Sequence, residues 1–270
     1  MGDMYEKLEK LKAQLEGYAR VAVAFSGGVD SAFLLKVAKD VLTGNCIAVT
    51  VRSGLFPQTE FMEASGFCSD IGVRQEVVEG DAIFSDEFIS NPPDRCYICK
   101  RSFFSSILSV ASSHGITTVC EGSNIDDLGD YRPGLKAISE LGIKSPLRDC
   151  GFTKSEIRLL SAEFALPTSN KPSMACLASR IPYGERITGK KLAMVEEAEN
   201  FLRGLGFRQS RVRIHGDTAR IEIEPECFDR LMHDRDKTIK AFKDIGFAYV
   251  SLDLCGYRTG SMNEVLQTVR

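Results

Sequence analysis

The sequence predicts an α/β fold: a doubly wound parallel sheet over residues 1–170, a loop or linker over 171–188, and a small α+β domain over 189–270. Three observations predict it. Short apolar runs alternate with helical patterns in the first part, which is typical of parallel sheets with helical crossovers. A glycine-rich turn joins the first expected strand to the next helix. Finally, 270 residues suffice for one large domain with a smaller companion.

Hydrophobic periodicity and turn residues predict the elements in order. In the first part we expect helices at 3–17, from 31 to the turn at 43–45, and at 58–71, 100–114 and 153–165, with strands at 21–25, 46–51, 74–78 and 116–122. Thr153 and Glu156 form a predicted capping box. Three prolines and one glycine without periodicity indicate an active-site loop over 166–188. The second domain follows with helices at 189–204 and 228–245 and strands at 210–215, 218–224 and 247–252.

The composition, 43% hydrophobic and 26% charged, is that of a globular protein. Apolar runs fall far short of the roughly 20 residues of a membrane-spanning helix, and the N-terminus has no apolar leader segment, so we expect a cytoplasmic protein without membrane contact. Nine cysteines, an odd number, predict free thiols, some of them metal-binding or reactive. A net charge of −3 gives no general attraction to nucleic acid.

The segment SGGVDS, between an expected strand and an expected helix, is the most informative motif. Gly27 and Gly28 allow successive backbone N–H groups to point at one anion, and the helix N-terminus adds partial positive charge. Ser26 and Ser31 add hydroxyl groups, and Asp30 can hold a magnesium ion. The segment lacks the lysine of GxxxxGK[ST], so it differs from the phosphate loop of kinases and GTPases. The alternative is a capped helix that begins with a glycine turn.

The order strand, SGGVDS, helix resembles the PP-loop of the N-type ATP pyrophosphatases, or adenine nucleotide α-hydrolases. These enzymes cleave ATP between the α and β phosphates and transfer AMP to a substrate. The resemblance implies that ATP and Mg²⁺ are bound, with Arg52 near the adenine and with Ser123 and Asp127 near the nucleotide and magnesium. Each of these segments could also be an ordinary polar loop.

The cysteines suggest an iron–sulfur site. Cys96 and Cys99 form a CxxC motif with basic neighbours just before an expected helix, which favours the thiolate. This motif is compatible with a redox dithiol, half of a zinc site or iron–sulfur ligation. Cys176, in the polar loop at the expected domain junction, is the best candidate for a third thiol, and three thiolates would leave one iron of a [4Fe–4S] cluster open to sulfide. A redox pair and unconnected thiols remain alternatives. Three cysteines in or beside apolar strands are expected to pack in the core: Cys46, Cys120 and Cys255.

Four segments resemble the LarE family over nearly the whole chain: SGGVDS, GSNIDDLGDYRPG at 122–134, KPSMACLASRIPYG at 171–184 and LDLCGYRTGSMNE at 252–264. LarE proteins are ATP-dependent sulfurtransferases of nickel-pincer cofactor biosynthesis for lactate racemase. They convert the carboxylates of pyridinium-3,5-biscarboxylic acid mononucleotide into thiocarboxylates. The resemblance implies this substrate, catalytic roles for Cys176 and Asp30, and a homo-oligomer, which is a hexamer in the family.

The family has two branches that differ in their source of sulfur. In one branch, a cysteine that matches Cys176 gives up its own sulfur and becomes dehydroalanine. The presence of Cys96 and Cys99 makes this chain similar to the other branch, in which three cysteines bind a [4Fe–4S] cluster that carries the sulfur. The resemblance therefore implies repeated turnover supplied by sulfide or another sulfur donor, with sacrificial donation from Cys176 as the alternative.

Arginines are the candidate ligands for the substrate phosphate. Arg211 and Arg213 are two apart in an expected strand, so both guanidinium groups share one face and suit bidentate phosphate binding. The corresponding LarE arginines bind the mononucleotide phosphate, and Arg180, near Cys176, is a further candidate. Alternating Arg and Val is also the pattern of a half-solvated strand.

Three other functions remain as alternatives. A [4Fe–4S]-dependent tRNA thiolase of the same superfamily would need a basic RNA surface, against which the net charge argues. An amide-forming synthetase would need an ammonia source and no cysteine triad. A nucleotide-binding sensor without catalysis would not release pyrophosphate in response to the pyridinium substrate.

Overall fold

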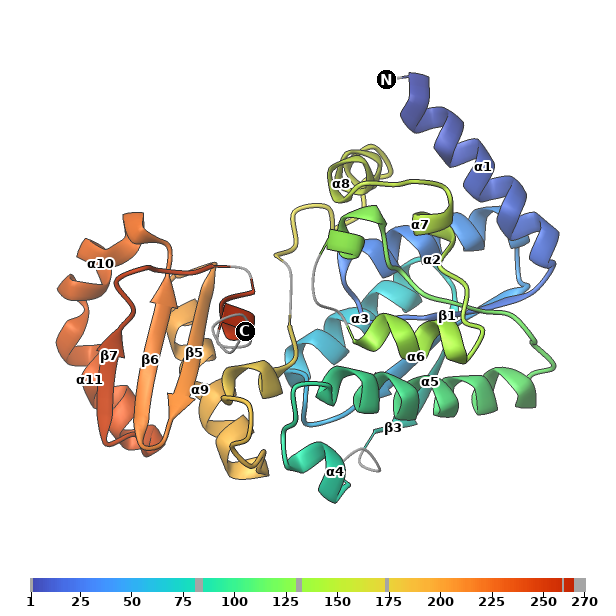
Figure 1. The fold of residues 1–270 in the computed structure, drawn as a ribbon. Helices are drawn as coiled ribbons and strands as arrows, with labels where there is room; N and C mark the ends of the chain where they lie inside the picture. The colour runs from blue at the N-terminus through green and yellow to red at the C-terminus, as the bar shows by residue number, and fades with distance from the viewer. Residues whose placement is uncertain (1, 81–84, 130–132, 173–174, 259, 265–270) are drawn as a thin grey trace. The chain divides into compact units, whose positions relative to one another are not determined.

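The structure of the protein is a computed structural model that describes residues 2–80, 85–129, 133–172, 175–258 and 260–264 (Figure 1). The chain forms two compact units. Unit 1 comprises residues 1–84 and 94–173, and unit 2 comprises residues 85–93 and 174–270.

Unit 1 is built on a four-stranded parallel sheet with the strand order β3-β2-β1-β4. The strands are β1 (Val21–Ala24), β2 (Cys46–Arg52), β3 (Arg74–Glu79) and β4 (Val119–Cys120). In the register of the sheet, Val23 pairs with Ala48 on one side and with Cys120 on the other. This parallel sheet with helical crossovers confirms the α/β fold predicted from the sequence.

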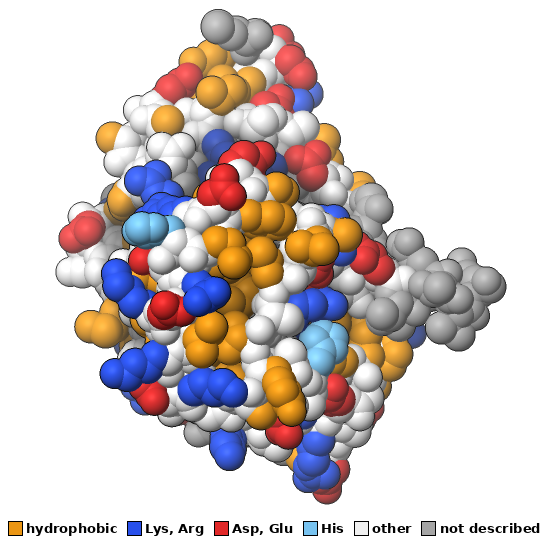
Figure 2. Space-filling model, turned by 90° about the vertical axis from the view of Figure 1, so that its left-hand side faces the viewer, with side chains coloured by type: hydrophobic (Ala, Val, Ile, Leu, Met, Phe, Trp, Pro, Cys, Tyr) orange, Lys and Arg blue, Asp and Glu red, His pale blue; other side chains and the backbone are white. Residues whose placement is uncertain are grey.

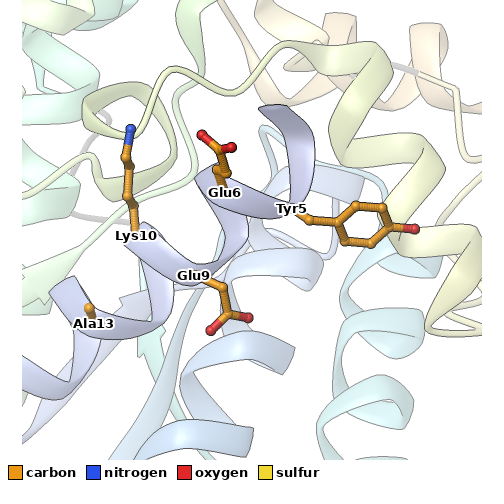
Figure 3. Close-up of a pocket in the computed structure, with 5 residues that line it drawn as sticks. All are labelled: Tyr5, Glu6, Glu9, Lys10 and Ala13. Atoms are coloured by element: carbon orange, nitrogen blue, oxygen red, sulfur yellow. The ribbon is translucent and has the colours of Figure 1, made fainter. Parts of the chain in front are cut away.

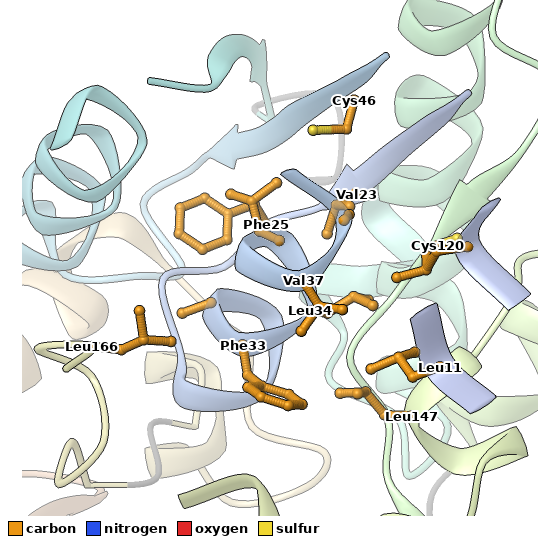
Figure 4. Packing of buried hydrophobic residues seen from close by; sticks show 14 of the residues in the cluster. Leu11, Val23, Phe25, Phe33, Leu34, Val37, Cys46, Cys120, Leu147 and Leu166 are labelled. Atoms are coloured by element: carbon orange, nitrogen blue, oxygen red, sulfur yellow. The ribbon is translucent and has the colours of Figure 1, made fainter. Parts of the chain in front are cut away.

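Helices cover both faces of this sheet (Figure 1). They are α1 (Gly2–Tyr18), α2 (Val29–Leu42), α3 (Gln58–Asp70), α5 (Arg95–Ser113), α6 (Gly134–Glu140), α7 (Pro146–Asp149) and α8 (Lys154–Glu163). Val21 and Val23 pack with Leu11 of α1 and Phe33 of α2, in the cluster shown in Figure 4. Ala22 instead belongs to the cluster of α5 and α6. Because successive strand residues face opposite sides and both sides are buried, the strand is apolar throughout.

Several predicted boundaries were wrong. Helix α5 begins at Arg95 rather than near residue 100, so the CxxC motif lies within the helix. Two prolines and the N-cap residue Asp94 precede it. Strand β4 has two residues, Val119 and Cys120, where 116–122 was expected. Beyond it, Glu121 N donates to the carbonyl oxygen of Lys144 rather than to a neighbouring strand of the sheet. The helix expected at 228–245 is two helices, α10 (Phe228–His233) and α11 (Arg235–Ile245), which meet at Asp234. The Thr153 capping box is confirmed.

Unit 2 contains a mixed three-stranded sheet with the order β5-β6-β7. Strands β5 (Ser210–His215) and β6 (Thr218–Ile223) are antiparallel, and β7 (Tyr249–Leu252) pairs with β6 in parallel. Helix α9 (Gly189–Gly204) contacts β5, and α11 contacts α9 and β7. Val212 and Ile214 are buried on one face of β5, and by strand alternation Arg211 and Arg213 share the other. Unit 2 also contains the short helix α4 (Asp86–Ile89).

The surface of unit 2 carries apolar as well as charged side chains. Figure 2 shows apolar side chains gathered among lysines and arginines on one face of the molecule. Among the residues of unit 2 that the structure describes, the exposed large apolar ones are Met232, Ile239, Tyr249 and Leu254. Cys255, expected in the core, is exposed because it lies in the turn after β7, whereas Cys46 and Cys120 are buried as predicted. No helix in the described part of the chain has the length and apolar character needed to span a bilayer.

Substitutions of two neighbouring leucines test how α8 packs against the core. Leu160 is fully buried in the core, so Leu160→Ala is expected to lower the free energy of unfolding by about 2–5 kcal/mol. Leu159 is 59% exposed, so Leu159→Ala makes the same change in helix propensity without a cavity and should shift stability by less than about 0.5 kcal/mol. Urea unfolding followed by circular dichroism measures both. Equal losses of stability in the two variants would contradict the burial of Leu160 and the exposure of Leu159.

Candidate functional site

The segment SGGVDS forms a tight turn between β1 and α2. Gly27 has a φ of 74°, and a Cβ atom there would lie 3.0 Å from the Cβ atom of Ala64 on α3, so glycine is needed. Ser31 Oγ donates to the carbonyl oxygen of Gly28 at 3.1 Å and lies 3.1 Å from Ser26 Oγ. Gly28 is the N-cap of α2 and has no side chain to cap the first N–H groups of the helix. These N–H groups are therefore available to an anion such as phosphate.

The loop after β4 lies directly against this turn. A Cβ atom at Gly122 would lie 2.9 Å from the backbone nitrogen of Ser31, so the backbones approach as closely as glycine allows. Asn124 Nδ2 donates to Asp30 Oδ1 at 3.3 Å. The structure thus brings the phosphate-loop candidates together with the segment that follows β4.

Buried hydrogen bonds fix the shape of that segment. The buried Glu121 carboxylate accepts from Ser123 N at 3.0 Å, from Ser123 Oγ at 2.7 Å and from Ser145 Oγ. Asp127 Oδ2 accepts from Asn124 N at 3.0 Å. Ser123 and Asp127, the predicted nucleotide ligands, therefore help to hold the loop, and their contact with ATP stays a prediction.

Two lysines that the sequence analysis missed also reach the phosphate loop. Lys154 Nζ forms an ion pair with Asp30 Oδ2. Lys171 Nζ donates to the carbonyl oxygen of Gly27 at 3.2 Å and pairs with Glu60 and Glu63 on α3. Burial lowers the pKa of Lys171, but the hydrogen bonds with these two glutamates outweigh burial and leave the pKa above its ordinary value.

The signals that could have found these lysines were faint. Lys154 directly follows the N-cap residue of a predicted helix, and Lys171 opens one of the segments that resemble LarE. Neither position reveals that the side chain reaches a loop more than 100 residues earlier in the chain.

Arg52, which the sequence places near the adenine, is the last residue of β2. Its Nε donates to Glu79 Oε2 on β3 at 3.1 Å, and its guanidinium lies 5.6 Å from the centre of the Phe61 ring. The side chain is about half exposed, at the carboxyl end of the strand next to β1. This is the edge of a parallel sheet at which ligands bind.

The cysteines differ sharply in their surroundings. Burial raises the pKa of Cys68 and Cys120 to about 12, so these side chains stay protonated thiols. Cys96 and Cys99 are half-buried, three positions apart at the start of α5, and therefore lie on one side of the helix. Cys176 is half-buried in unit 2. Among the described residues, no three His, Cys, Asp or Glu side chains form a group that could hold a metal ion, so the three-cysteine site stays a prediction.

A buried ion pair holds the backbone at Cys176. Arg180 is fully buried, and its Nε and Nη2 donate to the two carboxylate oxygens of Glu199 at 2.8 and 2.9 Å. Arg180 Nη1 donates to the carbonyl oxygens of Ala175 and Cys176, while Glu199 Oε1 accepts from Val212 N. Arg180 therefore fixes Cys176 relative to α9 and β5, and its contact with the substrate stays a prediction.

Arg211 and Arg213 of β5 are also buried in polar surroundings. Arg213 donates to both carboxylate oxygens of Glu222, at 3.0 and 2.9 Å, and to the carbonyl oxygen of Ser179 at 2.7 Å. Burial and then the charge of Arg180 hold the pKa of Arg211 below its ordinary value. The carboxylate of Glu199, which is paired with Arg180, opposes this lowering of the pKa.

A shallow depression of about 550 Å³ on α1 is lined by Tyr5, Glu6, Glu9, Lys10 and Ala13 (Figure 3). All of these residues belong to one helix, and none is a predicted site residue. The depression and the candidate chemistry therefore do not coincide, and we assign it no function.

Sequence comparison identifies the family. No protein-family model matches the chain. The chain is 39% identical over 267 residues to the pyridinium-3,5-bisthiocarboxylic acid mononucleotide synthase of Lactiplantibacillus plantarum, and the match covers 98% of this chain and 97% of that protein. The chain belongs to the LarE family. LarE-like proteins are ATP-dependent enzymes of the adenine nucleotide α-hydrolase group, which confirms the enzyme class predicted from SGGVDS.

Two further relatives are compared with this assignment. An uncharacterised protein of Synechocystis is 40% identical over 262 residues, or 96% of this chain and 98% of its own. A glutamine-hydrolysing GMP synthase component of Methanococcus maripaludis is 28% identical over 218 residues, or 73% of this chain and 66% of its own. The similarity to the LarE-like synthase is therefore both higher and more complete than the similarity to the GMP synthase component.

The Arg180–Glu199 pair provides a stability test. Arg180→Met leaves the Glu199 carboxylate buried without its counter-charge, and we expect the free energy of unfolding to fall by about 3–5 kcal/mol. Arg203→Met, an exposed change on α9, should cost less than about 0.5 kcal/mol. Adding Glu199→Leu to Arg180→Met should recover part of the loss, because no buried charge then remains unpaired. Denaturant unfolding measures all three variants, and a loss for Arg180→Met as small as that for Arg203→Met would contradict this account.

Proposed function

We propose that this LarE-family chain is an ATP-dependent sulfurtransferase that converts the carboxylates of pyridinium-3,5-biscarboxylic acid mononucleotide into thiocarboxylates during nickel-pincer cofactor biosynthesis. The observation that carries the proposal is the 39% identity, over 98% of the chain, to a synthase named for the corresponding product. The phosphate loop of unit 1 and the arginine-rich surroundings of Cys176 in unit 2 support it.

Adenylation is the first chemical step of the proposal. A carboxylate resists nucleophiles because it is negatively charged and oxide is a poor leaving group. In the proposed reaction, the substrate carboxylate attacks the α-phosphorus of ATP, pyrophosphate leaves, and the acyl group then carries AMP as a good leaving group. The SGGVDS turn would hold the triphosphate, Arg52 would lie near the adenine, and the Asp30 carboxylate would bind Mg²⁺, which prefers oxygen ligands. Catalysis would come mainly from positioning and charge stabilisation.

The substrate phosphate is proposed to bind at Arg211 and Arg213. By strand alternation both residues share one face of β5, and the lowered pKa of Arg211 reflects burial first and then the charge of Arg180. A dianionic phosphate would offset that charge and accept forked hydrogen bonds from arginine. Arg180 contributes to the same positive surroundings from its buried position beside Cys176.

Sulfur transfer completes the proposed reaction. We assign Cys96, Cys99 and Cys176 as the ligands of a [4Fe–4S] cluster, because thiolates are the usual ligands of such clusters and all three side chains are half-buried rather than sealed in the core. If bound, a cluster held by these three thiolates would have one iron without a protein ligand and would supply a site for sulfide. The sulfur nucleophile attacks the acyl carbon and AMP leaves. Donation of the sulfur of Cys176 itself is the alternative.

The proposal includes a homo-oligomer, with a hexamer expected from the family resemblance. The exposed apolar residues of unit 2, such as Tyr249 and Leu254, would suit an interface between copies. Sedimentation of the purified chain measures its oligomeric state.

Pyrophosphate release tests the adenylation step. The wild-type protein should release pyrophosphate from ATP when the pyridinium mononucleotide is present, and Asp30→Asn should slow this release by about 100-fold or more, because the Mg²⁺ ligand is lost. Asp40→Asn makes the same chemical change on the same helix, at a residue paired with Lys36 on the surface, and should leave the rate unchanged. Release that depends on tRNA instead of the mononucleotide would contradict the proposal in favour of a tRNA thiolase.

Iron analysis tests the cysteine assignment. After anaerobic purification and reconstitution with iron and sulfide, Cys96→Ala should lose the visible absorbance of the cluster and its bound iron, while its affinity for ATP is retained. Cys255→Ala removes an exposed cysteine outside the proposed site and should keep both the absorbance and the iron. Full iron content in Cys96→Ala would defeat the assignment. Conversion of Cys176 to dehydroalanine in the wild-type protein, detected by mass spectrometry, would support sacrificial donation.

A further inference from the structure

We propose that Tyr257 is a positioning residue for Arg211, which it orients toward the substrate phosphate. The aromatic ring comes from the C-terminal segment of unit 2, residues 256–258 and 260–264 in the described part of the chain. This inference rests on the proposed function in one respect, which is that Arg211 and Arg213 bind that phosphate. The contacts of the C-terminal segment with both arginines point to it.

The two arginines are held in different ways. Arg213 donates to both carboxylate oxygens of the fully buried Glu222, so a partner on the neighbouring strand fixes its guanidinium group. Arg211 Nη1 donates to the carbonyl oxygen of Ser210 at 2.7 Å, and its guanidinium carbon lies 5.3 Å from the centre of the Tyr257 ring. An aromatic side chain from another part of the chain therefore helps to hold Arg211.

An aromatic ring is a suitable support for a guanidinium group that has to bind phosphate. The π electrons attract the cation, whereas the N–H donors of guanidinium lie in its own plane and point outward. A ring next to the central carbon can therefore orient the group and leave its charge unchanged. A carboxylate partner would instead engage those donors and offset the charge that attracts a phosphate.

The backbone at Tyr257 is fixed to the end of β6. Tyr257 N donates to the carbonyl oxygen of Ile223 at 2.9 Å. Gly256 has a φ of 67°, and a Cβ atom there would lie 2.8 Å from the same carbonyl oxygen, so this approach requires glycine. Ile223 pairs with Ser210 in the register of the sheet, and Ser210 directly precedes Arg211. The backbone of Tyr257 is therefore held at the strand end that carries Arg211.

The same segment also contacts the second arginine. Ser261 Oγ accepts a hydrogen bond from Arg213 Nη2 at 2.8 Å and lies 3.4 Å from a carboxylate oxygen of Glu222. Ser261 is buried, as are Arg213 and Glu222. One segment therefore contacts both candidate phosphate ligands, Arg213 through a hydroxyl group and Arg211 through the ring of Tyr257.

Two further contacts fasten the C-terminal segment. Arg258 donates to both carboxylate oxygens of Glu264 at 3.0 and 3.1 Å, which links the two ends of the segment. Tyr183 Oη donates to Asn263 Oδ1 at 3.0 Å, which ties the segment to the chain that follows Cys176. A side chain presented from such a fixed backbone can hold its neighbour in one orientation.

The phosphate dependence of binding tests the proposal. Wild-type protein should bind pyridinium-3,5-biscarboxylic acid mononucleotide more tightly than the matching nucleoside, which lacks the phosphate. Tyr257→Leu should weaken binding of the mononucleotide by about 2- to 30-fold, the loss of one cation–π contact, and leave binding of the nucleoside unchanged. Tyr257→Phe retains the ring and should bind both ligands as the wild type does. Isothermal titration calorimetry measures these affinities.

Phe164→Leu is the matched control. Lys36 Nζ lies 6.0 Å from the centre of the Phe164 ring, and Phe164 is a half-buried residue of unit 1. This variant loses an aromatic ring beside a cation outside the proposed phosphate site, so it should bind the mononucleotide and the nucleoside with wild-type affinity.

Three results would overturn the proposal. Equal weakening of mononucleotide and nucleoside binding in Tyr257→Leu would show a general structural role, and unchanged mononucleotide binding would show no role. A loss in Tyr257→Phe as large as that in Tyr257→Leu would assign the effect to the hydroxyl group instead of the ring. If Tyr257→Leu does not fold, as judged by circular dichroism, the same comparison is made with Tyr257→Met.

The outcome is separable from the proposed function. A wild-type protein that binds the nucleoside as tightly as the mononucleotide defeats the phosphate site at Arg211 and Arg213. Where the wild type does distinguish the two ligands, the response of Tyr257→Leu decides the role of Tyr257.

Discussion

The pairing of β1 with β4 is the constraint on which the candidate nucleotide site depends. Only two residue pairs join these strands, Ala22 with Val119 and Val23 with Cys120. This short ladder places the carboxyl end of β4 beside the SGGVDS turn, so that Gly122 meets the backbone of Ser31 and Asn124 reaches Asp30. A longer β4 would carry the chain straight past the turn. The segment that follows the short strand therefore lies against the SGGVDS turn.

Unit 2 uses buried charge to position its backbone. The Arg180 and Arg213 ion pairs are almost inaccessible to solvent, and apolar residues of similar volume could in principle be as stable. Apolar residues could not donate to backbone oxygens. Arg180 holds the carbonyl oxygen of Cys176 and Arg213 holds that of Ser179, so both ends of this turn are tied to α9 and β5. The polar network therefore fixes one conformation for the segment next to Cys176.

The parts of the structure that sequence analysis predicted well are those set by local physics. The apolar run VAVAF, the SGGVDS turn and the capping box at Thr153 each depend on residues a few positions apart. The Lys154–Asp30 pair joins residues 124 positions apart, and periodicity carries no information about it. Short helices such as α4 and α7, with four residues each, were missed because a single turn has no detectable period. Cys255 was wrongly predicted to be buried, because β7 ends at Leu252 and Cys255 lies in the turn that follows.

The nine cysteines show why residue type alone does not assign chemistry. Cys68 and Cys120 are sealed in the core of unit 1, and burial keeps them protonated, so they act there as small apolar side chains. Cys96 and Cys99 occupy the start of a helix and are only half-buried, as is Cys176. A sulfur that must meet an activated carboxylate has to be accessible, and a thiolate is the form that binds iron or attacks carbon. Burial therefore disfavours Cys68 and Cys120 for the proposed sulfur transfer, whereas Cys96, Cys99 and Cys176 are only half-buried.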